Sequence, residues 1–287
     1  LLLVSDVPGT VFSNRIMGRS MIERDDRSAL VEVGAGENWH ELVLWSLEQG
    51  LSGLDNLSLI PGLAGAAPIQ NIGAYGVELS SVLVSVTAWD WSKQTWRVFS
   101  REDCRFGYRD SRFKSSEPDR YLITSLRLSL DTEFQPRLSY PGLAEALEET
   151  APGAPNARQV SDAVVRIRRR KLPDPARTGN AGSFFKNPVV ERSLADDLRA
   201  DHPDLPAWPV GDIAVKLSAA WMIERCGLKG RREGAAGVSP LHALVLVNHG
   251  GASGADIWDL ACKVRSVVEQ AFGIVLEPEP RIFNFDN

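Results

Sequence analysis

The hydrophobic and polar positions of this 287-residue chain predict strands and helices mixed along its whole length. Stretches rich in β-branched and apolar side chains, as strands are, occur at residues 29–34, 82–88 and 121–130. The first of these (ALVEVG) alternates apolar and polar residues, which is typical of a half-buried strand. Residues 36–50 then predict a helix, since Asn38 is a suitable N-cap, Glu41 follows three residues later and Gly50 ends the apolar pattern.

The middle of the chain contains a change in composition that predicts a domain boundary. Residues 151–160 (APGAPNARQV) are typical of a linker or loop, and an amphipathic helix is expected from Ser161 to about Arg170, ended by Pro173. We therefore expect a boundary near residue 171, which divides the chain into domains at 1–170 and 171–287.

The remaining pattern continues the mixture of helices and strands. It predicts a helix at 214–226, a strand at 243–248 and a long helix at 253–272, in which Ser253 is the N-cap and Gly273 the end. The fold class expected from the sequence is thus α+β, with two unequal parts.

Composition excludes several classes of protein. The chain is 44% apolar and 24% charged, and its net charge of −5 argues against a nucleic-acid partner, because such proteins usually carry a basic excess. No segment approaches the roughly 18 consecutive apolar residues of a membrane span. The three cysteines (Cys104, Cys226 and Cys262) have neither disulfide-framework nor zinc-knuckle spacing, so free thiols in a reducing cytoplasm and no metal are expected.

The basic run RIRRRK at 166–171 has two interpretations. At the C-terminal end of a predicted helix, before a proline, positive side chains complement the helix dipole, and the negative net charge disfavours a nucleic-acid patch. Lys171 differs from the others because it adjoins the predicted hinge.

The segment 60–78 (IPGLAGAAPIQNIGAYGVE) is unusual for its small side chains. Such a run lets backbone N–H groups approach a phosphate or the edge of a flavin closely. It matches neither a P-loop nor a G-x-G-x-x-G fingerprint, and a tight loop packed against a neighbouring element is the structural alternative.

Three further segments present side chains suited to proton and charge handling. Arg109 in CRFGYRDS carries a guanidinium that suits a carboxylate or oxyanion, although pairing with Asp110 would also explain it. Ser183 stands on a turn of small residues in GNAGSFFKNP, and Glu279 lies between prolines in LEPEPRIF. Ser183 lacks the G-x-S-x-G surroundings of a hydrolase nucleophile, so a role as proton donor or a plain turn residue remains.

Taken in order along the chain, these segments resemble the UDP-N-acetylenolpyruvoylglucosamine reductases, the MurB family of peptidoglycan precursor synthesis. The resemblance is carried by motifs spread over nearly the whole chain: VGAGENWHELV (33–43), the segment 60–78, CRFGYRDSRFK (104–114), KLPDP (171–175), GNAGSFFKNPVV (179–190), GLKG (227–230) and LEPEPRIF (276–283). It implies an FAD-binding domain of the PCMH/vanillyl-alcohol-oxidase type at 1–170, incomplete at its start, and a C-terminal α/β substrate-binding domain at 171–287.

The resemblance also implies an activity, that of a UDP-N-acetylmuramate dehydrogenase of the bacterial cytoplasm. NADPH reduces FAD, and the reduced flavin passes a hydride to the enolpyruvyl double bond of UDP-N-acetylglucosamine enolpyruvate. By the same resemblance, Arg109 and Glu279 stabilise the charge that develops beside the substrate carboxylate, Glu279 as a protonated donor, and Ser183 gives the proton.

The implied ligand contacts follow from the same motifs. FAD is expected to contact residues of the small-residue segment: Gly62, Gly65, Ala66, Ala67, Ile69, Gln70, Asn71, Gly73, Ala74 and Gly76. Substrate contacts are expected at Tyr140, which matches the capping tyrosine of the type I subgroup, and at Lys171, Asn187 and His242.

Two departures from the family pattern qualify these expectations. The chain opens at LLLVSDVPGTV, just past the position of the family's G-x-G-S-N loop, so we expect its first subdomain to be missing and FAD binding to be weak. His242 stands where a glutamine is expected. One alternative is an inactive or incomplete MurB-like chain. The other is another PCMH-type flavin oxidoreductase, and the presence of Ser183 together with a late Glu279 argues against this second alternative.

Overall fold

A computed structural model describes residues 1–140, 142–148 and 153–284. The chain forms two compact units. The first unit is Phe12–Arg168, and the second unit combines Arg169–Asn287 with Leu1–Val11. The division between the units falls inside one helix, α3 (Ala157–Lys171), close to the predicted boundary at residue 171.

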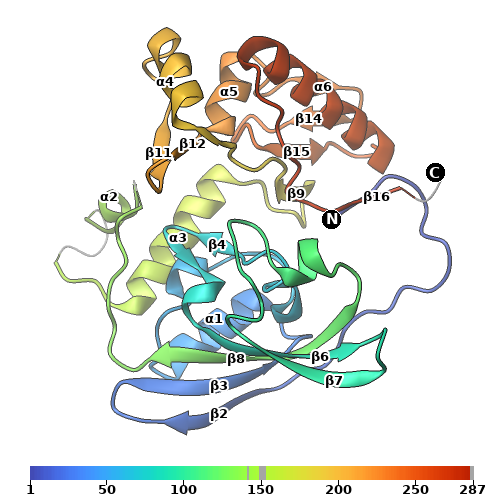
Figure 1. Cartoon of the computed structure of the whole chain (residues 1–287). Helices are drawn as coiled ribbons and strands as arrows, with labels where there is room; N and C mark the ends of the chain where they lie inside the picture. Colours follow the sequence, from blue (N-terminus) through green and yellow to red (C-terminus); the bar gives the residue numbers. More distant parts are fainter. Residues whose placement is uncertain (141, 149–152, 285–287) are drawn as a thin grey trace. The chain divides into compact units, whose positions relative to one another are not determined.

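The first unit is built on a five-stranded antiparallel sheet in the order β2-β3-β8-β6-β7. Its strands are β2 (Arg19–Arg24), β3 (Ser28–Gly34), β6 (Leu83–Asp90), β7 (Thr95–Ser100) and β8 (Tyr121–Asp131). The alternation predicted for residues 29–34 is confirmed, because Ala29, Val31 and Val33 of β3 are buried while the residues between them are half-buried. Figure 1 shows helix α1 (Trp39–Glu48) over one face of this sheet.

Helix α1 begins as its sequence predicts. The side chain of Asn38 accepts a hydrogen bond from the Glu41 backbone N–H at 3.1 Å, which satisfies one of the unpaired donors of the first turn. Gly50 follows the helix with φ of +71°, a left-handed conformation that glycine adopts without strain.

Short elements connect the sheet to its covering helices. They are the 3₁₀ turns η1 (Asp55–Leu57), η2 (Ala64–Ala66) and η3 (Leu79–Ser81), the hairpin of β4 (Gly73–Ala74) with β5 (Val77–Glu78), the π-helical turn η4 (Arg112–Ser116), and α2 (Leu143–Glu148). All of them belong to the first unit, and the small-residue segment 60–78 runs through η2 and the β4–β5 hairpin.

Helix α3 begins earlier than predicted, so the linker prediction at 151–160 is wrong for residues 157–160; residues 151 and 152 lie outside the described part. The reason is a reciprocal cap. The Asn156 side chain accepts from the Gln159 N–H at 2.9 Å, and the Gln159 side chain accepts from the Asn156 N–H at 2.9 Å. These two bonds start the helix despite the Pro/Gly-rich stretch before it.

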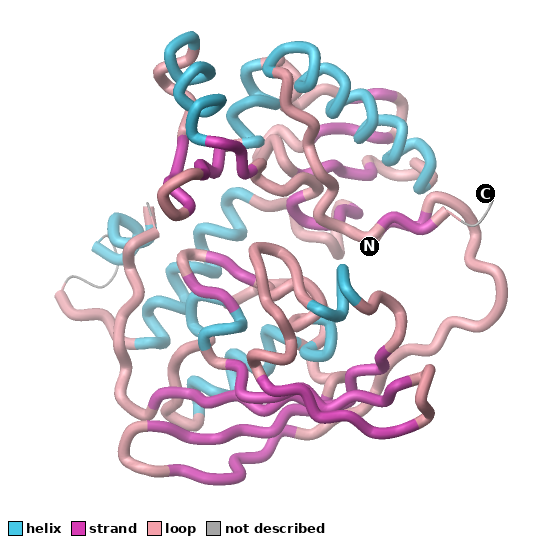
Figure 2. The backbone as a smooth tube through the Cα atoms, viewed as in Figure 1, coloured by secondary structure: helices cyan, strands magenta, loops and turns pink. Residues whose placement is uncertain are grey.

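The second unit contains an antiparallel sheet in the order β13-β14-β15-β9, covered by helices. Its strands are β9 (Gly179–Ser183), β13 (Arg232–Glu233), β14 (Ala236–Val238) and β15 (Val245–Asn248), and α5 (Ala219–Arg225) and α6 (Gly254–Phe272) pack into the same core. In Figure 2 the two helices lie on one side of these strands. The ends predicted for the long helix are confirmed, since Ser253 and Asp256 form a capping box and Gly273 has φ of +68°.

A second, three-stranded sheet in this unit corrects the helix predicted at 214–226. Residues Ala214–Leu217 form strand β12, between β10 (Val189–Glu191) and β11 (Ala207–Val210), and α4 (Arg192–Asp201) precedes β11. Helix α5 starts only after Ser218, whose side chain accepts from the Trp221 N–H. Val215 and Leu217 are buried at alternate positions, as in a strand. The prediction was wrong because it included this period of two in the helical pattern that follows.

The first residues of the chain differ from the prediction that they belong with residues 12–170. Strand β1 (Leu2–Leu3) pairs in parallel with β16 (Ile282–Phe283), and Leu2 packs on the core of the second unit. These contacts place residues 1–11 in the second unit.

Candidate active site

Arg109 lies in a tight turn of the first unit, and its guanidinium is held by the small-residue segment. Gly107 and Asp110 exchange backbone hydrogen bonds across the turn, and Arg109 has φ of +55°. Its Nη2 donates to the carbonyl oxygen of Gly73 at 2.7 Å, and its guanidinium lies 5.3 Å from the Tyr108 ring centroid. The loop of Arg109 and the small-residue segment were both candidate regions in the sequence, and in the structure they are in contact.

Further hydrogen bonds fasten the loop that carries Arg109 to residues 69–71. The Ser111 hydroxyl donates to the Ile69 carbonyl at 2.6 Å, and the Lys114 ammonium donates to the Gln70 side chain at 3.4 Å. The Asn71 amide donates to the Gly107 carbonyl at 3.1 Å. The loop and the segment therefore form one connected structure in which Arg109 has a fixed backbone.

Glycine occurs in segment 60–78 for two different physical reasons. A Cβ built at Gly65 would lie 2.5 Å from the Ala35 Cβ, and one built at Gly73 would lie 2.8 Å from Arg109 Nη1, so packing within the protein excludes larger residues at both. Gly62 is exposed, has φ of +114°, and its Cβ direction points into open space. Gly76 is also exposed and has φ of +81°.

The hydrogen bonds and exposure of segment 60–78 limit which of its residues can contact a bound group. The N–H groups of Gly65, Ala66, Ala67 and Ile69 already donate to backbone carbonyls. The exposed residues of the segment are Pro61, Gly62, Ala66 and Gly76, and the two glycines among them carry no side chain over their backbone. Asn71 is only 1% exposed and its side chain is hydrogen-bonded within the protein, so it offers a bound group no exposed contact.

Tyr140 lies beside Tyr75, which in turn contacts Arg168. Its ring is partly exposed and meets the Tyr75 ring edge-on, with centroids 4.9 Å apart. Tyr75 in turn hydrogen-bonds the Arg168 guanidinium; burial, the largest influence, raises the pKa of Tyr75 to about 12 and lowers that of Arg168. The helical spacing of Arg168 from the buried Val164 was the sequence signal that this basic residue faces inward.

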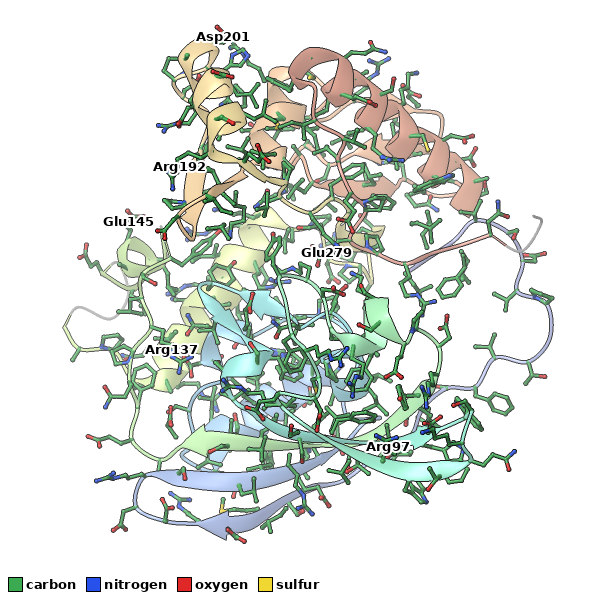
Figure 3. The ribbon with its side chains drawn as sticks, in the orientation of Figure 1. Arg97, Arg137, Glu145, Arg192, Asp201 and Glu279 are labelled. Atoms are coloured by element: carbon green, nitrogen blue, oxygen red, sulfur yellow. The ribbon has the colours of Figure 1, made fainter. Side chains whose placement is uncertain are left out.

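In the second unit, the segment carrying Glu279 runs antiparallel to the segment that follows Ser183. The Glu279 N–H donates to the Phe184 carbonyl at 2.8 Å, and the Lys186 N–H donates to the Glu277 carbonyl at 2.9 Å. Figure 3 labels Glu279 on the extended segment between α6 and β16. Phe184 and Phe185 are both 1% exposed, so the aromatic pair behind Ser183 anchors this ladder in the core.

The same pair of segments is closed by an ion pair. The Lys186 ammonium contacts the Glu277 carboxylate, so these two residues are joined by both a backbone bond and an ion pair. The expected catalytic residues of the second unit, Ser183 and Glu279, are therefore carried on adjoining backbones.

Lys171, Asn187 and His242 are all in the second unit, and the structure gives partners to the last two. The Asn187 side-chain oxygen accepts from the Ala219 N–H at 3.1 Å, at the start of α5. The His242 Nδ1 accepts from the Leu244 N–H at 3.2 Å, which leaves its proton on Nε2. Burial, and then the positive charge of Lys171, lower the pKa of His242 below 6.5.

This environment explains how histidine can stand in for glutamine. An imidazole with a lowered pKa is neutral near pH 7, and its Nε2–H is a hydrogen-bond donor, as a glutamine amide is. His242, where the resemblance led us to expect a glutamine, therefore offers a neutral donor.

The described residues contain neither a metal-binding cluster nor a membrane-spanning helix. Among them, no group of three or more His, Cys, Asp or Glu side chains is arranged to hold a metal ion. None of the helices described is both long and apolar enough to cross a membrane.

Comparison with known proteins identifies the family. Residues 174–283 match the model of the UDP-N-acetylenolpyruvoylglucosamine reductase C-terminal domain, and residues 3–98 match an FAD binding domain. The UDP-N-acetylenolpyruvoylglucosamine reductase of Pseudomonas aeruginosa is 52% identical over 283 residues, covering 99% of this chain and 83% of that protein. This chain belongs to the UDP-N-acetylenolpyruvoylglucosamine reductase family.

Other members of the family agree. The reductase of Xanthomonas euvesicatoria is 51% identical, over 98% of this chain and 81% of that protein. The crystal structure of the reductase (MurB) from Thermus caldophilus matches with a TM-score of 0.61 at 26% identity, over 88% of this chain and 72% of that one. The predicted resemblance and α+β fold class are confirmed.

Family membership makes the chain an FAD-dependent oxidoreductase of peptidoglycan synthesis. The residues present fit the cofactor at one place the structure shows plainly, because the exposed backbone at Gly62 leaves open space where another residue would carry a Cβ. Gly65 and Gly73 are small for a different reason, the packing of Ala35 and Arg109.

Proposed function

We propose that this member of the family reduces UDP-N-acetylglucosamine enolpyruvate to UDP-N-acetylmuramate with NADPH as the reductant. The observation that carries the proposal is the backbone ladder of the second unit, in which Glu279 is hydrogen-bonded to Phe184, the residue next to Ser183. Two groups that handle protons are thereby held on one rigid pair of segments, as a reduction that ends in proton delivery requires.

When bound and reduced by NADPH, FAD supplies the hydride that adds to the alkene. Negative charge then develops beside the substrate carboxylate. Arg109 stabilises that charge with a guanidinium already aimed by its bond to Gly73, and Glu279 donates a hydrogen bond from its protonated carboxyl group. Ser183 gives its hydroxyl proton to the other carbon of the former double bond.

The remaining predicted residues bind the substrate. The Lys171 ammonium suits the diphosphate, and the neutral His242 and the Asn187 amide offer hydrogen-bond donors. Tyr140 presents a partly exposed ring that can cover a bound sugar nucleotide. Because the substrates are nucleotides of intermediary metabolism, we place the enzyme in the bacterial cytoplasm.

The experiment separates the two half-reactions of the protein supplied with excess FAD. Ser183→Ala is expected to leave flavin reduction by NADPH within about twofold of wild type and to slow reoxidation by the enolpyruvate substrate by about 10²–10⁴-fold, the usual contribution of a positioned proton donor. Both rates are followed by flavin absorbance in a stopped-flow instrument. Ser193→Ala, at an exposed position of α4, is the matched control.

Two outcomes contradict the proposal. Equal slowing of both half-reactions would remove the proton-donor role of Ser183. Absence of NADPH oxidation dependent on the enolpyruvate in the wild-type protein would reject the proposed activity itself.

A further inference from the structure

Asn71 is a buried amide whose hydrogen-bonding groups are engaged within the first unit. Its side chain is enclosed, with the residue only 1% exposed, and its backbone has φ of +46°. Its amide nitrogen donates to the Glu78 carboxylate at 2.8 Å and to the Gly107 carbonyl at 3.1 Å, and its oxygen accepts from the Ser80 N–H at 3.0 Å. One side chain thus joins the segment that contains Glu78 and Ser80 to the loop that contains Gly107.

These bonds hold the surroundings of Arg109 at two points. Gly107 is the first residue of the turn on which Arg109 sits, so the bond from Asn71 fixes the backbone that carries the guanidinium. Glu78 is paired with Gly73 in the β4–β5 hairpin, and the Gly73 carbonyl accepts from Arg109 at 2.7 Å. Asn71 therefore fixes both the origin of the Arg109 side chain and the acceptor at its far end.

Only an amide satisfies all three neighbours. The Ser80 N–H requires an acceptor, whereas the Glu78 carboxylate and the Gly107 carbonyl require donors. An aspartate at residue 71 would keep the first bond, lose both donors, and bring its own carboxylate against two oxygen acceptors. The orientation of the amide is determined by these partners.

We propose that Asn71 is a positioning residue that acts on catalysis through Arg109, by setting where the guanidinium meets the substrate carboxylate. The inference rests on the role proposed for Arg109. Asn71 itself touches no reacting atom, and its contribution comes from the connection between the Arg109 turn and the β4–β5 hairpin.

The test uses the carboxylate of the substrate as its readout. Affinities are measured by calorimetry for UDP-N-acetylglucosamine enolpyruvate and for UDP-N-acetylglucosamine, which lacks the enolpyruvyl group and its carboxylate. Each is measured with excess FAD and then without FAD. Their ratio reports recognition of the carboxylate. Asn71→Asp is expected to lower this ratio about tenfold, as expected for a displaced charge-assisted hydrogen bond.

Two variants of Glu78 separate positioning from stability. Glu78→Gln alone keeps an acceptor for the Asn71 amide and is expected to leave the ratio unchanged. Combined with Asn71→Asp, it supplies a donor to the new carboxylate, so it restores the hairpin bond and the melting temperature but leaves Gly107 without its donor. The ratio is expected to stay low; recovery of the ratio together with stability would overturn the inference.

Arg109→Met completes a double-mutant cycle. If Asn71 acts through Arg109, Asn71→Asp has no further effect on the ratio in the Arg109→Met protein. Two results would overturn the inference and leave the proposed function intact. One is an equal effect of Asn71→Asp on the ratio in both backgrounds. The other is a ratio that Arg109→Met lowers but Asn71→Asp alone leaves unchanged. Failure of wild-type turnover would reject the proposed function independently.

Discussion

Gly73→Ala is the sharpest perturbation of the site that the structure offers, because it adds one methyl group directly against Arg109. The added Cβ would lie 2.8 Å from Arg109 Nη1, 3.0 Å from the Glu78 Cγ and 3.2 Å from the Val77 carbonyl oxygen. Unstrained contacts between such atoms are about 3.5 Å or longer. The backbone at Gly73 lies outside the left-handed region, so alanine meets no strain other than these contacts.

The magnitude follows from which neighbour can move. Two of the three contacts are parts of the β4–β5 hairpin, whereas the guanidinium is the end of a flexible side chain. A shift of about 0.7 Å at Nη1 takes Nη2 away from the Gly73 oxygen, now 2.7 Å distant, to beyond the range of a good bond. Hydrogen bonds to charged groups contribute about 1.5–3 kcal/mol, and the lower value suits a half-buried arginine.

The expected result is a fall of about tenfold in kcat/KM for the enolpyruvate substrate, since about 1.4 kcal/mol corresponds to a factor of ten. The melting temperature should change little, because the lower chain entropy of the unfolded alanine variant offsets part of the crowding. The assay is steady-state NADPH oxidation with FAD in excess, beside thermal denaturation of each variant.

Gly107→Ala is the matched control for this prediction. It lies on the same loop as Arg109, and its added Cβ would make an ordinary contact of 3.7 Å with Asp110. Wild-type kcat/KM in Gly73→Ala, or an equal loss in Gly107→Ala, would refute the reasoning that the methyl group acts by displacing Arg109.

Three further predictions concern residues elsewhere. Burial raises the pKa of Asp55 above its value in the unfolded chain, so ionisation of Asp55 destabilises the folded protein as pH rises through the folded pKa. Asp55→Asn should therefore have a higher melting temperature than wild type at pH 7–8, and this difference should shrink toward pH 4. Ser253→Ala removes the capping box of α6 and should cost about 1 kcal/mol in urea denaturation. His242→Gln should bind UDP-N-acetylglucosamine within about threefold of wild type at pH 7.5, because the lowered pKa of His242 leaves a neutral hydrogen-bond donor in both proteins; a much larger loss would contradict the donor role proposed for His242.

The sequence predicted those parts of the fold that local chemistry determines. The caps at Asn38 and Ser253 and the alternation of β3 are set by neighbouring residues, and all three are confirmed. Strand β12 was missed because its four residues lead directly into a helix, and only pairing with β10 and β11 distinguishes them. The start of α3 depends on a side-chain exchange within a Pro/Gly-rich stretch, where composition favours a loop.

The candidate site also depends on contacts that local sequence does not predict. Residue types and motif order name Arg109, Ser183 and Glu279 as candidates, but they do not reveal the contacts that hold these residues in place. The bond from Arg109 to the Gly73 carbonyl joins residues 36 positions apart, and the ladder from Phe184 to Glu279 joins positions farther apart still. Contacts of this kind arise from tertiary packing, which a single sequence does not encode locally.

Glycines of the small-residue segment have two different surroundings that its composition cannot distinguish. At Gly62 the absence of a side chain leaves open space for a ligand, whereas at Gly73 it leaves space for Arg109. Asn71 lies between these two glycines and is bonded toward the arginine rather than toward solvent. If this stretch borders the bound FAD as expected, it also holds the Arg109 guanidinium through Gly73, and we expect that a substitution in it alters carboxylate recognition without touching the flavin. Loss of activity in a variant of this segment is consequently not evidence of lost FAD until flavin content and carboxylate discrimination have been measured separately.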